Sequence, residues 1–285
     1  MKILILGVTG MLGSTVFKRL MKDEALDVWG TLRRVSDMKY FPEESHRKIV
    51  ANIDVLDSDS LVDVMAEIKP EVVINCVGLI KQLSNADDPL VALPINAILP
   101  HRLAKLCLLV GARLIHISTD CVFNGRKGMY KEEDISDAED LYGKSKYIGE
   151  VHSLSHVVTL RTSIIGHELN SHSSLVDWFL SQRDSVKGYK QAIFSGLPTV
   201  ELADVIRKFV INNVNLRGLY HVSSSPIDKH SLLCLIASTY SVDNEIAIDD
   251  KVKIDRSLDS SKFQREAGYT APVWEELINK MHDNK

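Results

Sequence analysis

The stretch Lys2-Ile3-Leu4-Ile5-Leu6-Gly7-Val8-Thr9-Gly10-Met11-Leu12-Gly13 decides the fold of this 285-residue chain. Residues 2–7 form a short apolar run that ends in glycine, which is typical of a buried parallel strand. Apolar residues then recur at helical spacing between residues 11 and 21. Glycines at such a junction allow a tight turn and let the backbone approach a pyrophosphate, which then rests on the helix N-terminus. The stretch predicts a dinucleotide-binding loop, with cofactor contacts at Gly7, Thr9, Gly10, Met11, Leu12 and Gly13.

Beyond this loop, short apolar runs alternate with helical patterns. Strands are predicted at 27–32, 48–53, 71–77, 113–118 and 157–162, and helices at 57–69, at about 94–110 and around 142–146. Strands that alternate with helices at this spacing imply a parallel sheet with right-handed crossovers. The sequence therefore predicts an α/β fold, with a Rossmann-type doubly wound parallel sheet over residues 1–165.

After Gly166 the regular alternation ends. A short strand is predicted at 218–222, and helices near 200–213, 229–240 and 272–282. We expect residues 166–285 to form mainly a smaller C-terminal substrate-binding lobe, with helix 198–213 packing back on the first domain.

Composition and charge exclude several classes of protein. Hydrophobic content of 45% and charged content of 25% are ordinary for a globular protein, and the net charge of −4 gives no basic footprint for nucleic acid. The cysteines Cys76, Cys107, Cys121 and Cys234 show no CxxC spacing, so no metal site is expected. No signal peptide or membrane-spanning run is recognised, and we expect a cytoplasmic location without a membrane partner.

The residues after the second predicted strand favour one cofactor. An NAD site usually has Asp or Glu there to bind the ribose 2′-hydroxyl, whereas this chain reads Thr31-Leu32-Arg33-Arg34. Guanidinium groups pair well with a 2′-phosphate. Arg33 and Arg34 therefore favour NADPH, with NADH as the alternative cofactor and two solvated surface arginines as the structural alternative.

Two further strand ends are candidate cofactor contacts. Asp54 and Val55 follow the third strand, where an aspartate could meet the adenine amino group or simply cap a turn. Cys76, Val77 and Gly78 end the fourth strand, where small residues would let the cofactor pass.

The stretch Leu141-Tyr142-Gly143-Lys144-Ser145-Lys146-Tyr147-Ile148-Gly149-Glu150 carries a Tyr and a Lys four residues apart. This spacing places both side chains on one face of a helix, so the ammonium can approach the phenol. Moving a tyrosine pKa from about 10 to about 7 requires roughly 4 kcal/mol. A unit charge about 4 Å away supplies about that much at an effective dielectric constant near 20. We therefore expect Lys146 to lower the pKa of Tyr142.

Together with the glycine loop, Ser118-Thr119-Asp120-Cys121-Val122-Phe123-Asn124-Gly125 and the Tyr142–Lys146 stretch resemble the extended short-chain dehydrogenase/reductases. The most similar branch is the dTDP-4-dehydrorhamnose reductase type, whose pattern is STDxVFxG followed by YGxSKxxGE. Similar stretches follow at 161–163, 196–199, 218–223 and 256–261, so the resemblance covers nearly the whole chain.

The resemblance implies a catalytic triad of Thr119, Tyr142 and Lys146. In reduction, the nicotinamide would deliver a hydride to a ketone carbon while Tyr142 donates its phenolic proton to the oxygen, which Thr119 would orient. Lys146 would also hold the nicotinamide ribose. Asn96 is expected to bind backbone groups behind the site.

The implied activity is NADPH-dependent reduction of the 4-keto group of a nucleotide-linked 4-keto-6-deoxyhexose, in the synthesis of cell-surface polysaccharide precursors. Cys121 stands where a 4,6-dehydratase would carry Glu, which argues against dehydration. A nucleotide-sugar 4-epimerase and a non-catalytic NADP-binding regulatory subunit are the alternatives, and a homodimer is the assembly left open. The candidate substrate residues are Lys81, Asp120, Arg161 and Trp178; Lys81 could reach an N-acetyl or uracil group, which leaves a UDP-sugar open.

Overall fold

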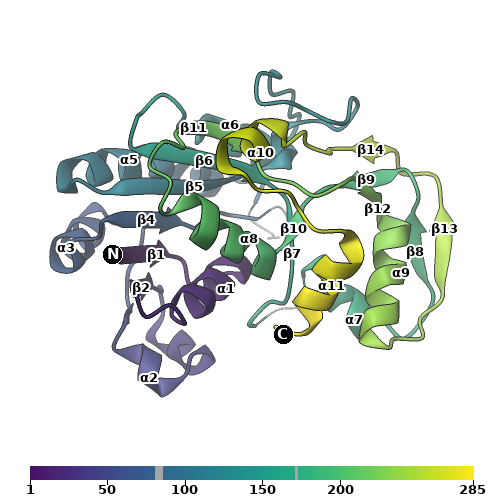
Figure 1. Ribbon diagram of the computed structural model, residues 1–285, viewed down its shortest axis with the longest axis horizontal. Helices are drawn as coiled ribbons and strands as arrows, with labels where there is room; N and C mark the ends of the chain where they lie inside the picture. Colours follow the sequence, from purple (N-terminus) through teal and green to yellow (C-terminus); the bar gives the residue numbers. More distant parts are fainter. Residues whose placement is uncertain (81–85, 171–172) are drawn as a thin grey trace.

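The computed structural model describes residues 1–80, 86–170 and 173–285 and is built around a seven-stranded sheet (Figure 1). The strand order is β11-β6-β5-β4-β1-β2-β3, and every neighbouring pair is parallel. The strands are β1 (Lys2–Leu6), β2 (Asp27–Thr31), β3 (Ile49–Val50), β4 (Val72–Asn75), β5 (Arg113–Thr119), β6 (Val157–Thr162) and β11 (Gly218–His221). This order confirms the predicted doubly wound parallel sheet.

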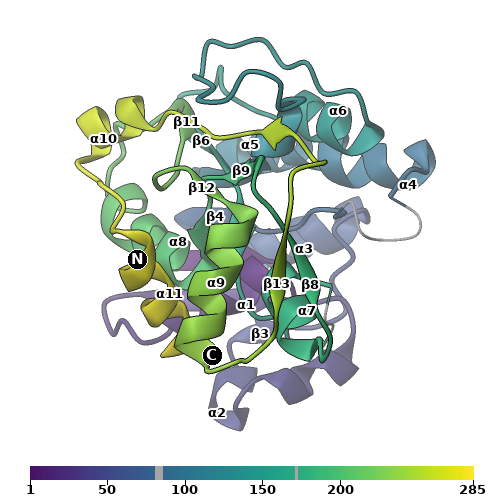
Figure 2. The same ribbon diagram turned by 90° about the vertical axis from the view of Figure 1, so that its right-hand side faces the viewer.

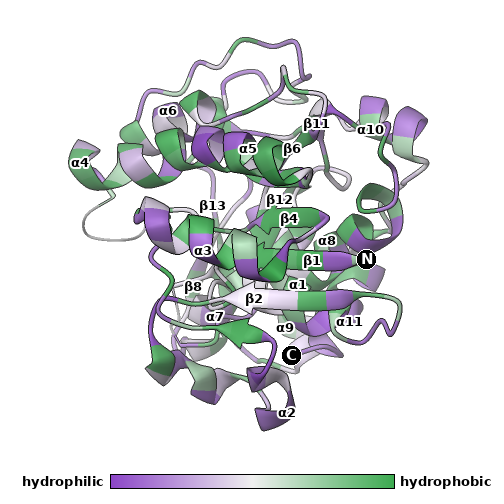
Figure 3. Cartoon of the chain, turned by 90° about the vertical axis from the view of Figure 1, so that its left-hand side faces the viewer, coloured by the Kyte–Doolittle hydropathy of each residue, from purple (hydrophilic) through white to green (hydrophobic). Residues whose placement is uncertain are grey.

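Both faces of the sheet are covered, because alternate residues of each strand point to opposite sides. Ile3 and Ile5 pack in one core with residues of α1 (Met11–Leu20), whereas Leu4 and Leu6 pack in a second core with α3 (Ser58–Ile68) and α5 (Leu99–Val110). Hydrophobic residues dominate β1 and β4 at the centre of the sheet (Figure 3). The near-continuous apolar runs of these strands follow from burial on both faces.

The helix predicted at about 94–110 is longer in the structure and is not uniform. It consists of α4 (Pro89–Ala92), the π-helical turn η2 (Leu93–Ile98) and α5. Among the described residues, the run Pro89–Val110 alone has the length and composition of a membrane span, with a mean hydropathy of 1.3. The expectation that no run reaches this length was therefore wrong. Leu99, Leu103 and Cys107 of this helix are buried against the sheet, as in the core helix of a globular domain.

Small sheets and helices form the lobe that faces the carboxyl ends of the main strands. β9 (Ala192–Phe194) pairs with β12 (Ile227–Asp228) and β14 (Ile254–Asp255), β8 (Val186–Tyr189) with β13 (Ile246–Asp249), and β7 (Ile164–Ile165) with β10 (Leu197–Pro198). The helices of the lobe are α7 (Leu175–Ser181), α9 (Lys229–Tyr240) and α11 (Trp274–His282), whereas α10 (Ser261–Ala267) packs against β11 of the main sheet. Figure 2 shows α9 between α11 and the β8–β13 pair.

Part of the chain after residue 166 lies with the main sheet. α8 (Thr199–Val205), continued by the π-helical turn η4 (Ile206–Val210), packs against α1, where Arg19 donates two hydrogen bonds of 2.8 Å to the Asp204 carboxylate. β11 extends the sheet beyond β6. Through α8 and β11, the chain after residue 166 is therefore joined to the main sheet on one side of the site.

The remaining described elements lie in connections. η1 (Val35–Tyr40) and α2 (Glu43–His46) follow β2, η3 (Asp120–Val122) follows β5, and α6 (Leu141–Ile148) precedes β6. The predicted third strand at 48–53 is only two residues long, because it lies at the sheet edge and pairs with β2 alone.

Candidate active site

A cavity of about 680 Å³ lies at the carboxyl ends of the central strands, between the main sheet and the C-terminal lobe. This is where ligands bind in open α/β sheets. Ten of the predicted cofactor and catalytic residues line it, together with the predicted substrate residue Asp120: Thr9, Gly10, Met11, Leu12, Cys76, Val77, Gly78, Thr119, Tyr142 and Lys146. The fold thus brings together residues that are up to 137 positions apart, from Thr9 to Lys146.

The glycine loop forms the floor where α1 begins. Thr9 to Leu12 line the cavity, while Gly7 and Gly13 lie beneath them. A Cβ on Gly13 would lie 2.1 Å from the Gly7 carbonyl oxygen, so only glycine lets the helix approach the loop this closely. The free backbone N–H groups at the start of α1 can receive an anion. This geometry fits the pyrophosphate of a dinucleotide.

Tyr142 and Lys146 are placed by α6, whose N-terminus is capped by Asp140. The Asp140 carboxylate accepts a 2.7 Å hydrogen bond from the backbone N–H of Gly143. A Cβ on Gly143 would lie 2.2 Å from the Cys121 carbonyl oxygen. The absence of a side chain there lets α6 pack directly against η3, which brings Tyr142 close to Thr119.

Lys146 is buried and its ammonium donates a 2.8 Å hydrogen bond to the backbone carbonyl of Ile117. Burial lowers the pKa of Lys146 to about 8, and the negative charge of Glu150 opposes this shift. The lysine is therefore oriented by the end of β5.

The phenol of Tyr142 differs from the expectation for it. Burial raises the pKa of Tyr142, and the group that counteracts this rise is the Thr119 hydroxyl, not Lys146. The expectation of a strongly lowered pKa counted the charges of the lysine and of the oxidised nicotinamide and omitted the desolvation of the phenolate. Burial therefore favours the protonated phenol.

Thr119 sits at the end of β5 as the N-cap of η3. Its hydroxyl oxygen accepts the Cys121 backbone N–H at 3.1 Å and lies 3.1 Å from Oδ1 of Asp120. Asp120 is 7% exposed, and burial raises its pKa.

Asn96, in the π-helical turn η2, supports the site from behind. Its Oδ1 accepts the backbone N–H of Leu79 at 2.9 Å, and its Nδ2 donates to the Leu79 carbonyl and to the Ser145 hydroxyl, each at 3.2 Å. These bonds join the loop after β4 to α6. The prediction that Asn96 binds backbone groups is confirmed.

The residues predicted to hold the adenosine end lie outside the cavity lining. Arg34 makes a two-pronged pair with Asp37, with both hydrogen bonds at 3.1 Å. Arg33 is exposed and has no ion-pair partner in the part of the chain that the structure describes. Asp54 is exposed and accepts the Leu56 backbone N–H at 2.9 Å, so it caps a turn, and Val55 is half-buried beside it.

Two predicted substrate residues, Trp178 and Arg161, are not brought to the cavity. Trp178, on α7, is 38% exposed and is not part of the lining, and Lys81 lies outside the described residues. Arg161 is 2% exposed and is bound by the Glu150 carboxylate through two hydrogen bonds of 2.7 Å. Its third partner is His221 Nε2 at 3.2 Å. The Arg161 guanidinium is thus held inside the protein, away from the cavity lining.

Two cations at the far side of the cavity were not predicted. Arg256 follows β14 and donates a 2.7 Å hydrogen bond to the Phe123 carbonyl, and Lys229 begins α9. Arg256 opens the stretch 256–261 that contributed to the resemblance, which was the available signal. No pattern in the sequence marked Lys229, because its position depends on how α9 packs against the sheet.

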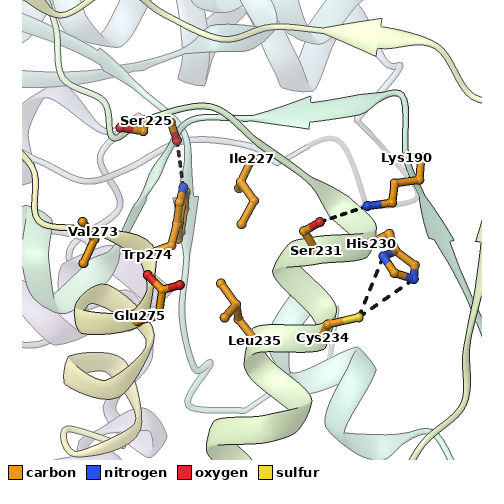
Figure 4. A pocket seen from close by; sticks show the side chains of 10 residues that line it. All are labelled: Lys190, Ser225, Ile227, His230, Ser231, Cys234, Leu235, Val273, Trp274 and Glu275. Atoms are coloured by element: carbon orange, nitrogen blue, oxygen red, sulfur yellow. Dashed lines mark hydrogen bonds between the residues drawn. The ribbon is translucent and has the colours of Figure 1, made fainter.

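A second cavity, of about 600 Å³, lies in the C-terminal lobe between α9 and α11 (Figure 4). Its walls include the Trp274 ring, which donates to the Ser225 carbonyl at 2.8 Å, and Cys234 beside His230. None of the predicted site residues lines it.

Known proteins resemble this chain in both sequence and fold. A family model described as RmlD substrate binding domain matches residues 1–285. Methionine adenosyltransferase 2 subunit beta from Bos taurus is 27% identical over 256 residues, which is 85% of this chain and 72% of that protein. A dTDP-4-dehydrorhamnose reductase from Mycolicibacterium smegmatis is 33% identical over 153 residues, 52% of this chain and 40% of that protein. The crystal structure of dTDP-4-dehydrorhamnose reductase from Bacillus anthracis in complex with NADP superposes with a TM-score of 0.81 at 22% identity, covering 100% of this chain and 99% of that one.

Proposed function

The chain belongs to the RmlD substrate binding domain family, and on that premise we propose that it reduces the 4-keto group of a nucleotide-linked 4-keto-6-deoxyhexose with NADPH. The observation that carries the proposal is the meeting of Thr119, Tyr142 and Lys146 in one cavity with the glycine loop. The product would serve as a precursor of cell-surface polysaccharide in the cytoplasm.

Each side chain has a task in this reaction. A reduced nicotinamide, when bound, supplies the hydride. Tyr142 donates its phenolic proton to the ketone oxygen, and the Thr119 hydroxyl binds the same oxygen and orients it. Lys146, held by the Ile117 carbonyl, keeps a positive charge near the phenol as that proton leaves. The walls formed by both parts of the chain limit the access of water.

The direction of the shift in the pKa of Tyr142 fits the role of proton donor in a reduction. Burial raises this pKa and so favours the protonated phenol, which is the form that can donate to a ketone oxygen.

The direct test is to incubate the purified protein with dTDP-, UDP- and GDP-linked 4-keto-6-deoxy sugars, with NADPH and NADH compared side by side. We expect NADPH oxidation with at least one of these sugars. Lack of turnover across the whole panel would refute the proposal.

Arg33 is the residue we expect to discriminate between the two cofactors. A hydrogen bond between charged groups contributes about 1.5–3 kcal/mol, and at an exposed site the lower end applies. Arg33→Ala should therefore weaken NADPH binding about tenfold and leave NADH binding unchanged. Arg34→Ala should have the smaller effect, since Asp37 already holds that guanidinium. Titration of cofactor fluorescence measures both; equal weakening for NADH would contradict the assignment.

A subunit of another enzyme is the second candidate function. It is favoured by the similarity to methionine adenosyltransferase 2 subunit beta over 85% of the chain. The sugar panel distinguishes the reductase function from the subunit function. If NADPH binds but no sugar is turned over, the reductase function is excluded. Co-purification with a second enzyme whose activity the chain changes would then support the subunit function.

A further inference from the structure

The hydroxyl of Thr119 has more partners than it has hydrogens. A threonine hydroxyl offers one hydrogen and two lone pairs. One lone pair receives the Cys121 backbone N–H, and Oδ1 of Asp120 lies at hydrogen-bond distance, 3.1 Å away. An ionised carboxylate can only accept. When Asp120 is charged, Thr119 must therefore give its single hydrogen to Asp120, and none remains for a substrate oxygen.

A neutral Asp120 reverses this bond. The carboxyl group then donates its own hydrogen to the second lone pair of Thr119. Both lone pairs of the hydroxyl are then filled by Asp120 and Cys121, so its hydrogen is released from Asp120 toward the cavity, which Thr119 and Asp120 both line and where the Tyr142 phenol also lies within its reach. The two protonation states of Asp120 thus correspond to two directions of the Thr119 O–H.

The surroundings of Asp120 come from four elements. Cys121 lies beside it in η3, Tyr142 faces it from α6, Lys229 from the start of α9, and Arg256 from the segment after β14. Burial raises the pKa of Asp120. The positive charge of Arg256, the hydrogen bonds with Thr119 and the Cys121 thiol, and the charge of Lys229 oppose the rise without cancelling it. The neutral carboxyl is therefore favoured over a wider pH range than in an exposed aspartate.

We propose that Asp120 is a positioning residue that acts through Thr119: the neutral carboxyl turns the Thr119 hydroxyl toward the substrate ketone, and the carboxylate turns it away. The proposal rests on the proposed reductase function. It changes no part of the proton balance, because the hydride comes from the reduced cofactor and the proton from Tyr142, while the proton of Asp120 stays on the residue.

The pH profile of kcat for sugar reduction tests the switch. In the wild type, kcat should fall as the pH rises through the pKa of Asp120. In Asp120→Asn the amide has no such titration, so this decrease should disappear. Asp63→Asn, on the exposed face of α3, is the matched control and should retain the wild-type profile. A decrease that persists unchanged in Asp120→Asn would overturn the proposal.

A double variant tests whether Asp120 acts through Thr119 or acts directly on the substrate. Thr119→Val removes the hydroxyl, so Asp120 has nothing left to orient. The variant Thr119→Val/Asp120→Asn should therefore have the same kcat and the same flat profile as Thr119→Val alone. Multiplication of the two single effects would show that Asp120 acts independently of Thr119 and would overturn the proposal.

The pH dependence of stability tests the protonation of Asp120 without any substrate, so it can fail independently of the proposed reductase function. Because the folded-state pKa of Asp120 is raised, the folded protein holds a proton that the unfolded chain releases. Stability therefore falls as the pH rises from the ordinary aspartate pKa through the raised value. Urea unfolding should show this decrease in the wild type relative to Asp120→Asn. If no sugar is turned over, the reductase function fails, whereas an absent stability difference overturns the switch.

Discussion

Replacing Tyr142 with phenylalanine is expected to lower kcat for sugar reduction by about 10²- to 10⁴-fold, because the variant has no proton to give to the ketone oxygen. NADPH binding should be preserved, since the change removes one oxygen atom and leaves the ring in place. Steady-state kinetics and cofactor titration on the same preparation measure the two effects.

Tyr147 provides the matched control for this experiment. It lies on the same helix one residue after Lys146, but it is 41% exposed and does not line the cavity. Tyr147→Phe should leave kcat unchanged. Activity of Tyr142→Phe within a few-fold of the wild type would rule out the phenol as the proton donor.

The largest expected loss of stability follows from breaking the Glu150–Arg161 pair. The side chains are 0% and 2% exposed, and the Ser118 hydroxyl donates a further 2.6 Å hydrogen bond to the same carboxylate. The Phe123 ring covers the guanidinium, with 5.1 Å between the ring centroid and Arg161 Cζ. Removing one partner leaves a buried charge without a counter-ion. Arg161→Met should therefore lower the free energy of unfolding by about 3–5 kcal/mol.

An exposed pair of the same chemistry is the control for this prediction. Arg126 and Glu139 are joined by the same distance, 2.7 Å, but their side chains are 77% and 67% exposed. Arg126→Met should cost at most about 1 kcal/mol. Urea unfolding curves measure both variants. The double variant Glu150→Gln/Arg161→Met should be more stable than Arg161→Met, since it leaves no unpaired carboxylate; equal losses from Arg161→Met and Arg126→Met would contradict the argument.

The same pair shows why the role of one residue could not be predicted from its position in the chain. Arg161 lies near the end of a predicted strand, at the level of the site, and a cation there is a reasonable substrate contact. Glu150 is eleven positions away in the sequence, and the two charges meet because α6, which leads into Glu150, packs against β5, the strand beside β6. The Arg161 guanidinium pairs with the buried Glu150 carboxylate, and Arg256 and Lys229 are cations that line the cavity instead.

The pKa of Tyr142 could not be predicted for a related reason. The spacing of Tyr142 and Lys146 correctly places both residues at the cavity, because helical periodicity depends only on local geometry. The cost of charging the phenol depends on how much water surrounds it. That is set by η3, α6 and the C-terminal lobe together, none of which the four-residue spacing describes.

The sequence by itself determined the parallel sheet, the glycine loop and the Tyr142–Lys146 pair that lines the cavity. These features depend on short-range patterns: apolar runs, helical periodicity and glycines at a strand–helix junction. The tertiary structure alone decided which charges are paired, which groups lose their water, and that the hydroxyl of Thr119 is shared with Asp120. Burial and electrostatic interactions depend on distances between segments far apart in the chain, so they are fixed only when the sheet and the C-terminal lobe close around the site.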